Sequence, residues 1–356
     1  MSATRAIGYL ATVLALAASA SAQTAGKRVL LLYDMEGVTG ATDYRYTSFL
    51  HPDEYLEGRK SLTADVNAAI AGLKAAGATE VVVVDGHGSG NSTGPDVFED
   101  QLIAPARMHY RNRPFDIYMD SYDASFDAIV AIAMHASAGN SVGFLSHTYT
   151  VEDTEYRVNG IPFCESQILA MGAARVKVPL IMVSGDDQLE REVNRHLPWA
   201  KYATVKHAVS REKAESLPRE EASRRIENAA REALLALADA KVPELAPPYR
   251  FSLSFQDEAQ ARNAATWPGA ELLANGLSVQ VRAGDFEDGY RQSLRLISLA
   301  GVIGRTSAIQ AVISAQPNAQ ALRQAISDWV GNRWIGRVAP PQPPAPTTPP
   351  RYWGAR

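Results

Sequence analysis

The chain has 356 residues, of which 46% are hydrophobic, and carries a formal net charge of −4 at pH 7. This length allows a sizeable core in one or two domains. Nucleic acids and anionic membranes attract clustered positive charge, so the acidic balance and the lack of a Lys/Arg run argue against both partners. The single cysteine, Cys164, cannot form an internal disulfide, so stability has to come from the core.

The N-terminal residues 1–22 have the features of a secretory signal peptide. Arg5 precedes an apolar stretch over residues 7–18, and Ala-Ser-Ala at 20–22 is a cleavage signal before Gln23. We therefore expect an exported protein, periplasmic or secreted. The apolar run is short for a bilayer span, and a retained N-terminal anchor is the alternative. No later segment is expected to have the length of a transmembrane helix, so no membrane span is predicted in the mature chain.

Buried strands alternate with amphipathic helices along most of the chain. Continuous apolar runs predict strands at Val29–Leu32, Glu80–Val84, Phe126–Met134 and Pro179–Val183. Apolar residues at helical spacing, or N-capping residues, predict helices over Asp53–Ala76, Glu165–Arg175, Gln188–Arg195, Arg219–Ala240 and Asp285–Leu299. This alternation predicts an α/β fold with a mainly parallel sheet flanked by helices.

The second half of the chain contains signals of a second, smaller α/β lobe. Asn159-Gly160 predicts a two-residue hairpin turn between Thr150–Val158 and Ile161–Phe163. Further strands are expected at Arg250–Phe255 and Leu277–Val281, and residues 243–248 are a possible lobe boundary.

The C-terminal part is expected to lie beyond the main domain, which we place at residues 28–306. Residues 307–338 are predicted to form a helical extension, with one or two helices over Ile309–Trp334. Residues 339–356 are rich in proline and predict an extended tail outside the fold.

A pair of carboxylates follows the first predicted strand. Asp34 and Glu36 lie two residues apart, so an extended backbone points both side chains to the same side. Two neighbouring carboxylates repel each other unless a positive group lies between them, and a divalent metal ion is the favoured occupant. Alternatively, Asp34 caps a turn and Glu36 is solvated.

Two histidines follow two further predicted strands, His87 after the second and His135 after the third. In open α/β sheets ligands bind beyond the carboxyl ends of the strands, so these residues are expected to meet Asp34 and Glu36 in one crevice. A single histidine at a strand end is more often a packed, hydrogen-bonded residue. Taken together, oxygen and imidazole ligands without thiolate suit zinc, manganese or iron.

Glu165 and His147 are further candidates. Glu165 starts a predicted helix, where it could bind metal or simply favour the helix dipole. His147 could be a ligand, a general acid/base or a nucleophile, or a strand residue bonded to backbone. Cys164 is more simply a buried small residue than a soft ligand, and Asp186-Asp187 is explained by helix capping.

The glycines of Gly86-His87-Gly88-Ser89-Gly90 resemble a dinucleotide-binding loop. Such a loop needs its last glycine to open a helix directly, and here loop-forming residues continue to Pro95. This interpretation is therefore disfavoured.

The ordered set of motifs resembles the D-aminopeptidase DppA family, the M55 metallopeptidases. The motifs are Asp34-Met35-Glu36-Gly37, Val84-Asp85-Gly86-His87, the region at His135, Ser146-His147, Asn159–Glu165, Ser184–Asp187, Val205-Lys206, Ser210-Arg211, Trp267–Gly269 and Val279–Leu296. The resemblance runs from about residue 28 to about residue 306. The predicted leader and the segment beyond residue 307 depart from the family pattern.

The resemblance implies a dinuclear zinc site. By motif position, Asp34 bridges two zinc ions, Glu36 and His135 complete one, and His87 and Glu165 complete the other. His147 matches the catalytic residue of the family, which releases N-terminal D-amino acids such as D-alanine from short peptides and assembles as ring-shaped homodecamers. The alternatives are a metal-dependent amidohydrolase acting on L-peptides or other small amides, and a periplasmic peptide-binding protein of an uptake system.

Overall fold

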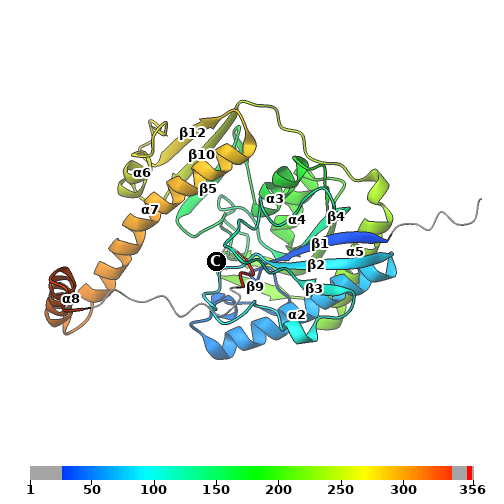
Figure 1. Ribbon diagram of the computed structural model, residues 1–356, viewed down its shortest axis with the longest axis horizontal. Coiled ribbons are helices and arrows are strands. Elements are labelled where there is room, and N and C mark those ends of the chain that lie inside the picture. The colour runs from blue at the N-terminus through cyan, green and yellow to red at the C-terminus, as the bar shows by residue number, and fades with distance from the viewer. Residues whose placement is uncertain (1–25, 339–350, 355–356) are drawn as a thin grey trace, which may run out of the picture.

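The computed structural model describes residues 26–338 and 351–354 (Figure 1). The predicted signal peptide and residues 339–350 lie outside the described residues. Two β-sheets organise the described chain, a large one of seven strands and a small one of five.

The large sheet has the strand order β3-β2-β1-β4-β7-β8-β9. All neighbouring strands are parallel except β8 and β9, which form an antiparallel pair at one edge. Its strands are β1 (Lys27–Tyr33), β2 (Ala78–Asp85), β3 (Ala106–Met108), β4 (Ala128–Met134), β7 (Leu180–Asp186), β8 (Lys201–Ser210) and β9 (Lys213–Ser216). The predicted mainly parallel sheet is confirmed, and β3, β8 and β9 are strands that the sequence did not predict.

Helices cover both faces of this sheet. Alternate residues of β1 point to opposite faces, so Leu31 packs with helices α2 (Pro52–Ala75) and α5 (Arg219–Leu235), whereas Leu30 packs with α3 (Glu165–Ala174) and α4 (Asp187–His196). Short 3₁₀ helices in the connections are η1 (Tyr44–Thr47), η2 (Glu99–Gln101) and η3 (Leu237–Asp239). The strands are therefore buried on both sides, as continuous apolar runs predict.

The small sheet is antiparallel, with the order β11-β12-β10-β5-β6. Its strands are β5 (Asp153–Val158), β6 (Ile161–Pro162), β10 (Tyr249–Phe255), β11 (Glu271–Leu272) and β12 (Ser278–Ala283), and α6 (Glu258–Ala264) lies beside it. Asn159 and Gly160 both have positive φ, which confirms the predicted hairpin turn. The lobe takes strands from both sides of residues 243–248, so it is not one continuous stretch of chain.

The last helices extend away from the sheets (Figure 1). Helix α7 (Phe286–Ser314) continues well past the predicted end at Leu299, and α8 (Ala319–Trp334) follows it. By length and composition α7 is long and apolar enough to cross a membrane, so the expectation that no later segment has that length does not hold. Its first turns, however, pack into the core through Tyr290 and Leu296, and a core helix meets the same criterion.

The end of the chain returns to the large sheet. Tyr352 forms an antiparallel bridge with Arg111, which follows β3. The prediction that the tail lies wholly outside the fold is therefore wrong for residues 351–354. The prediction failed because the prolines lie within residues 339–350, whereas Tyr352 and Trp353 are aromatic residues that pack on the protein.

Candidate metal centre

The parallel register of three strands brings the predicted ligands to one edge of the large sheet. Tyr33, the last residue of β1, lies opposite Asp85 of β2 and Ile132 of β4. The chain segments that follow these strands therefore start level with one another. Asp34, His87 and His135 leave the sheet at this edge, and the predicted convergence is what the structure shows.

The loop after β1 passes very close to the end of β4. The amide of Gly37 donates to the Ala133 carbonyl at 2.8 Å, and a Cβ at position 37 would lie 2.1 Å from the Met134 carbonyl oxygen. Ala133 itself has a φ of 61°, and its amide is held by the Ser184 hydroxyl at 2.9 Å. Only glycine fits this approach, which brings the loop that carries Glu36 against the end of β4, the strand that His135 follows.

Six ligand-type side chains form two adjoining groups. One contains Asp34, Glu36 and His87, and the other contains His135, His147 and Glu165. Asp34 connects them, because its Oδ2 lies 3.2 Å from Nε2 of His135. Two metal ions could therefore bind side by side.

The closest contacts pair the ligands in a different way from the resemblance. Glu36 lies 3.3 Å from Nε2 of His87, and Glu165 lies 3.7 Å from Nε2 of His135. The resemblance instead pairs Glu36 with His135 and His87 with Glu165. The assignment of each ligand to a particular ion stays a prediction.

All three histidines present the same ring nitrogen to the cluster. Nδ1 of His87 contacts Asp96 at 2.9 Å, that of His135 contacts the Ala136 carbonyl at 3.0 Å, and that of His147 contacts the Leu145 carbonyl at 2.8 Å. An acceptor at Nδ1 fixes one proton there, so Nε2 is the nitrogen directed into the cluster, where a metal ion would take the place of a second proton. This arrangement is typical of metal-binding histidines.

The cluster concentrates negative charge in a buried place. Burial, together with the neighbouring Glu36, raises the pKa of Asp34 to about 7. Burial also opposes ionisation of Glu36, but the neighbouring His87 holds the pKa of this carboxyl well below its usual value. The pKa of His87 is raised, because Glu36 and Asp96 outweigh the opposing effect of burial.

Two buried atoms of the cluster make no hydrogen bond to any described residue, namely Oε2 of Glu36 and Nε2 of His135. Leaving such atoms without a partner costs free energy, and a metal ion would supply a partner for both. The donor set of carboxylate oxygens and imidazole nitrogens suits zinc. The residues present therefore fit a metal centre.

Neighbouring groups hold Glu165 and His147 in position. The hydroxyl of Tyr118 and the amide of Tyr149 both donate to the Glu165 carboxylate. The ring of His147 stacks on that of His135 with centroids 3.9 Å apart, and its Nε2 lies 4.0 Å from Glu165. Burial and the neighbouring His135 lower the pKa of His147, which favours its neutral form.

Asp186 and Cys164 have structural roles. Asp186 caps α4 by accepting from the amides of Gln188 and Leu189, as predicted, and it also accepts from the Phe144 amide in the loop before His147. Cys164 is buried at the N-terminus of α3, and burial raises the pKa of its thiol. In the described chain Gly90 opens no helix, so it lacks the context of a dinucleotide-binding loop.

Sequence reasoning predicted no role for three residues that support the cluster: Asp96, Tyr118 and Lys206. Asp96 is fully buried in the loop after β2, and Tyr118 lies in a connection without a strand or helix. Lys206 is also fully buried, and its ammonium donates to the carbonyls of Glu36 at 2.9 Å and Ala41 at 2.7 Å. The motif Val205-Lys206 was the one available signal, and it gave this lysine no role.

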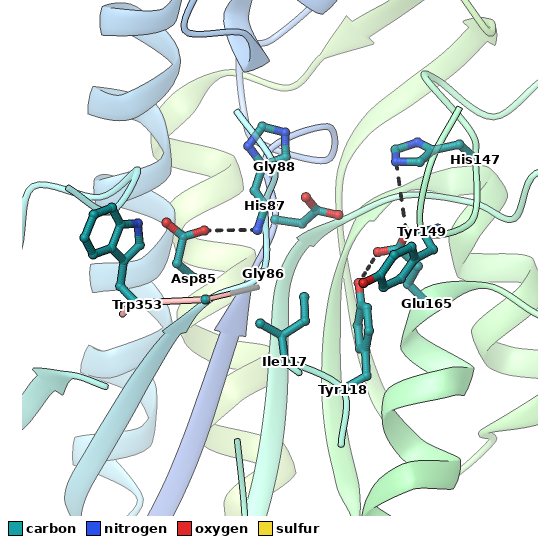
Figure 2. A pocket seen from close by; sticks show the side chains of 12 residues that line it. Asp85, Gly86, His87, Gly88, Ile117, Tyr118, His147, Tyr149, Glu165 and Trp353 are labelled. Atoms are coloured by element: carbon teal, nitrogen blue, oxygen red, sulfur yellow. Dashed lines mark hydrogen bonds and ion pairs between the residues drawn. The ribbon is translucent and has the colours of Figure 1, made fainter. Parts of the chain in front are cut away.

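A cavity of about 180 Å³ opens onto the cluster. Figure 2 shows His147, Tyr149 and Glu165 on one side of it and Asp85 and Trp353 on the other, with Ile117 and Tyr118 between them. Asp34, His87 and Glu165, three of the candidate metal ligands, therefore line a space that a small molecule can enter.

An α/β fold with a buried carboxylate–histidine cluster at the carboxyl edge of its parallel sheet defines a metal-dependent hydrolase. A sequence model of the peptidase M55 family, described as D-aminopeptidase, matches residues 28–294. The chain belongs to this family, and it is a metallo-aminopeptidase.

Two comparisons agree with this membership. A D-aminopeptidase of Bacillus subtilis (strain 168) is 29% identical over 276 residues, which are 77% of this chain and 97% of the relative. The solved structure of the Zn-dependent D-aminopeptidase DppA from Bacillus subtilis, a self-compartmentalizing protease, superposes with a TM-score of 0.69 at 27% identity. That match covers 77% of this chain and 97% of the other.

Replacing Lys206 tests whether this buried amine supports the loop after β1, which carries Asp34 and Glu36. In Lys206→Met the carbonyls of Glu36 and Ala41 lose their donor, and each unpaired buried group costs about 1–3 kcal/mol. We expect the free energy of unfolding, measured by urea denaturation, to fall by about 2–4 kcal/mol.

Lys201→Met is the matched control, because Lys201 is exposed on the same strand. It should change the free energy of unfolding by less than about 0.5 kcal/mol. Equal losses in the two variants would contradict a special role for Lys206.

Proposed function

We propose that this chain is an exported dinuclear zinc aminopeptidase that releases N-terminal D-amino acids, such as D-alanine, from short peptides. The observation that carries the proposal is the pair of adjoining ligand groups joined by Asp34 and His135. It supports two ions in one site within a D-aminopeptidase family.

Zinc ions at this cluster would supply a water of lowered pKa and a Lewis acid for the scissile carbonyl. Asp34, Glu36, His87, His135 and Glu165 would hold them. Asp96 keeps His87 in the tautomer that presents Nε2, and Tyr118 and Tyr149 fix the Glu165 carboxylate. Such supporting partners orient ligands and tune their basicity.

His147 is proposed to carry the proton during hydrolysis. Its ring lines the cavity, its Nδ1 is held by the Leu145 carbonyl, and its lowered pKa keeps Nε2 free to accept a proton near neutral pH. That proton can then pass to the leaving amine of the substrate. Because His147 also lies within reach of Glu165 and His135, a ligand role is the competing assignment.

Three further parts of the proposal have separate support. The D-specificity is supported by the D-aminopeptidase relatives. Export is supported by the predicted signal peptide over residues 1–22. Assembly as a ring-shaped homodecamer is supported by the family resemblance and by the self-compartmentalizing relative.

Two histidine variants separate metal binding from proton transfer. In His135→Ala we expect zinc content, measured by elemental analysis after gel filtration, to fall from two ions per chain to one or none. Activity should fall by more than the roughly 10–100-fold that the loss of a supporting partner costs. In His147→Ala we expect both ions to remain and hydrolysis to be lost.

His207→Ala is the control, because the His207 side chain is 54% exposed on β8. It should keep both zinc content and activity. Unchanged zinc in His135→Ala would show that the ligand set is wrong, and loss of an ion in His147→Ala would make His147 a ligand.

The stereochemical part is tested with D-Ala-D-Ala and L-Ala-L-Ala on the zinc-loaded protein. We expect kcat/KM to be at least about 10²-fold higher for the D-dipeptide, which is within the range that a pocket can discriminate by shape and hydrogen bonding. Cleavage of the L-dipeptide at a comparable or higher rate would favour the alternative, a hydrolase of L-peptides or other small amides.

A further inference from the structure

The C-terminal residues 351–354 reach the cavity that three of the proposed metal ligands line. Trp353 and Gly354 form part of its wall, next to Asp85, Gly86 and His87. The family match ends at residue 294, so this wall is supplied by a part of the chain that the family model does not include.

Consecutive contacts anchor these residues. The guanidinium of Arg351 lies 3.6 Å from the ring centroid of Tyr110. Tyr352 exchanges two backbone hydrogen bonds with Arg111, at 2.7 and 2.8 Å. A cation–π contact and a hydrogen-bonded bridge are both specific in geometry, so the backbone at Trp353 has a defined path.

Gly354 fixes the depth of the segment. It is buried, and a Cβ on this residue would lie 2.6 Å from the carbonyl oxygen of Asp85, the last residue of β2. The tail can therefore approach the strand end only because position 354 has no side chain. This approach brings the indole of Trp353 to the cavity, on the Asp85 side (Figure 2).

The indole of Trp353 forms part of the cavity wall and carries one hydrogen-bond donor, Nε1. Its Nε1 is buried and has no hydrogen-bond partner among the described residues. An indole N–H can only donate, so this buried N–H lacks an acceptor, and a peptide carbonyl is a group that could serve as one.

The space left by the segment is small. About 180 Å³ remain in the cavity, whereas pockets for drug-sized ligands usually measure about 300–1,000 Å³. In an aminopeptidase the substrate's N-terminal residue lies at the reacting centre, so the rest of the peptide must pass the walls of the cavity. A wall placed there therefore limits the length of peptide that can bind.

From this geometry we propose that residues 351–354 are a built-in length filter, with Trp353 as the specificity-determining residue that restricts the site to dipeptide-sized substrates. The inference rests on the proposed peptidase function. It assigns the segment to the binding of the substrate beyond its first two residues, not to the chemical step.

The test compares D-Ala-D-Ala with D-Ala-(Gly)₄ in the zinc-loaded full chain and in three variants. These are Trp353→Ala, Gly354→Val, which displaces the segment while keeping the indole, and a chain ending at Val338. In all three we expect kcat/KM for the pentapeptide to rise roughly tenfold relative to that for the dipeptide, through KM more than kcat.

Trp334→Ala is the matched control. Its indole is 87% exposed at the end of α8, so the ratio of the two peptides should stay at the wild-type value. An unchanged ratio in the chain ending at Val338, or an equal change in Trp334→Ala, would overturn the length filter.

A second measurement does not depend on activity. The Arg111 amide donates to the Tyr352 carbonyl, so hydrogen exchange at Arg111 should be slower in the full chain than in the chain ending at Val338. Equal exchange would overturn the docking of the segment. If neither D-peptide is cleaved by the full chain, the proposed function fails. The filter is then judged from the calorimetric affinities of the same two peptides, and an equal ratio in the full and shortened chains would overturn it.

Discussion

The repulsion among three buried carboxylates is the constraint on which the rest of the site depends. Asp34, Glu36 and Glu165 are each less than 10% exposed, and each lies within 4 Å of a histidine nitrogen. Charges of one sign in such a place cost several kcal/mol unless protons, cations or hydrogen-bond donors neutralise them. The histidines whose Nδ1 is already occupied direct Nε2 at these carboxylates, and Lys206 adds a donor behind the Glu36 backbone.

The fold brings these groups together through register and one irregularity. The parallel pairing of β1 with β2 and β4 makes three strand ends level, so ligands about 50 residues apart in sequence share one edge. At Ala133 the backbone takes a left-handed conformation, and the pairing of β4 with β7 is interrupted there. Such a conformation costs of order 1 kcal/mol or more and persists only where its surroundings fix it, here through Ser184 and Gly37.

The sequence predicted the parts of this site that follow from periodicity. Apolar runs located β1, β2, β4 and β7, and the rule on strand ends then placed Asp34, His87 and His135 together. Strand β8 was missed because its inner residues alternate with lysine and histidine and its end pairs with β9. Asp96 and Tyr118 were missed for another reason: they lie in irregular connections, where no period predicts which way a side chain points.

The contact between the tail and the site was also beyond sequence reasoning. Proline-rich composition describes how a segment behaves locally, but the bridge from Tyr352 to Arg111 joins residues 241 positions apart. No local pattern contains such a pairing. Only Gly354 is a local signal of this contact, because a glycine beside aromatic residues allows a close backbone approach.

The charge cluster also connects metal binding to the stability of the fold. The proposed metal ligands come from the ends of β1, β2 and β4 and from the first turn of α3. Without metal these elements meet at repelling carboxylates, and a proton on Asp34, whose pKa burial and Glu36 raise to about 7, relieves part of the repulsion. An ion at the same place would take over from that proton and would tie these four segments together. Part of its binding free energy therefore becomes folding free energy, since the unfolded chain cannot assemble ligands so far apart in sequence.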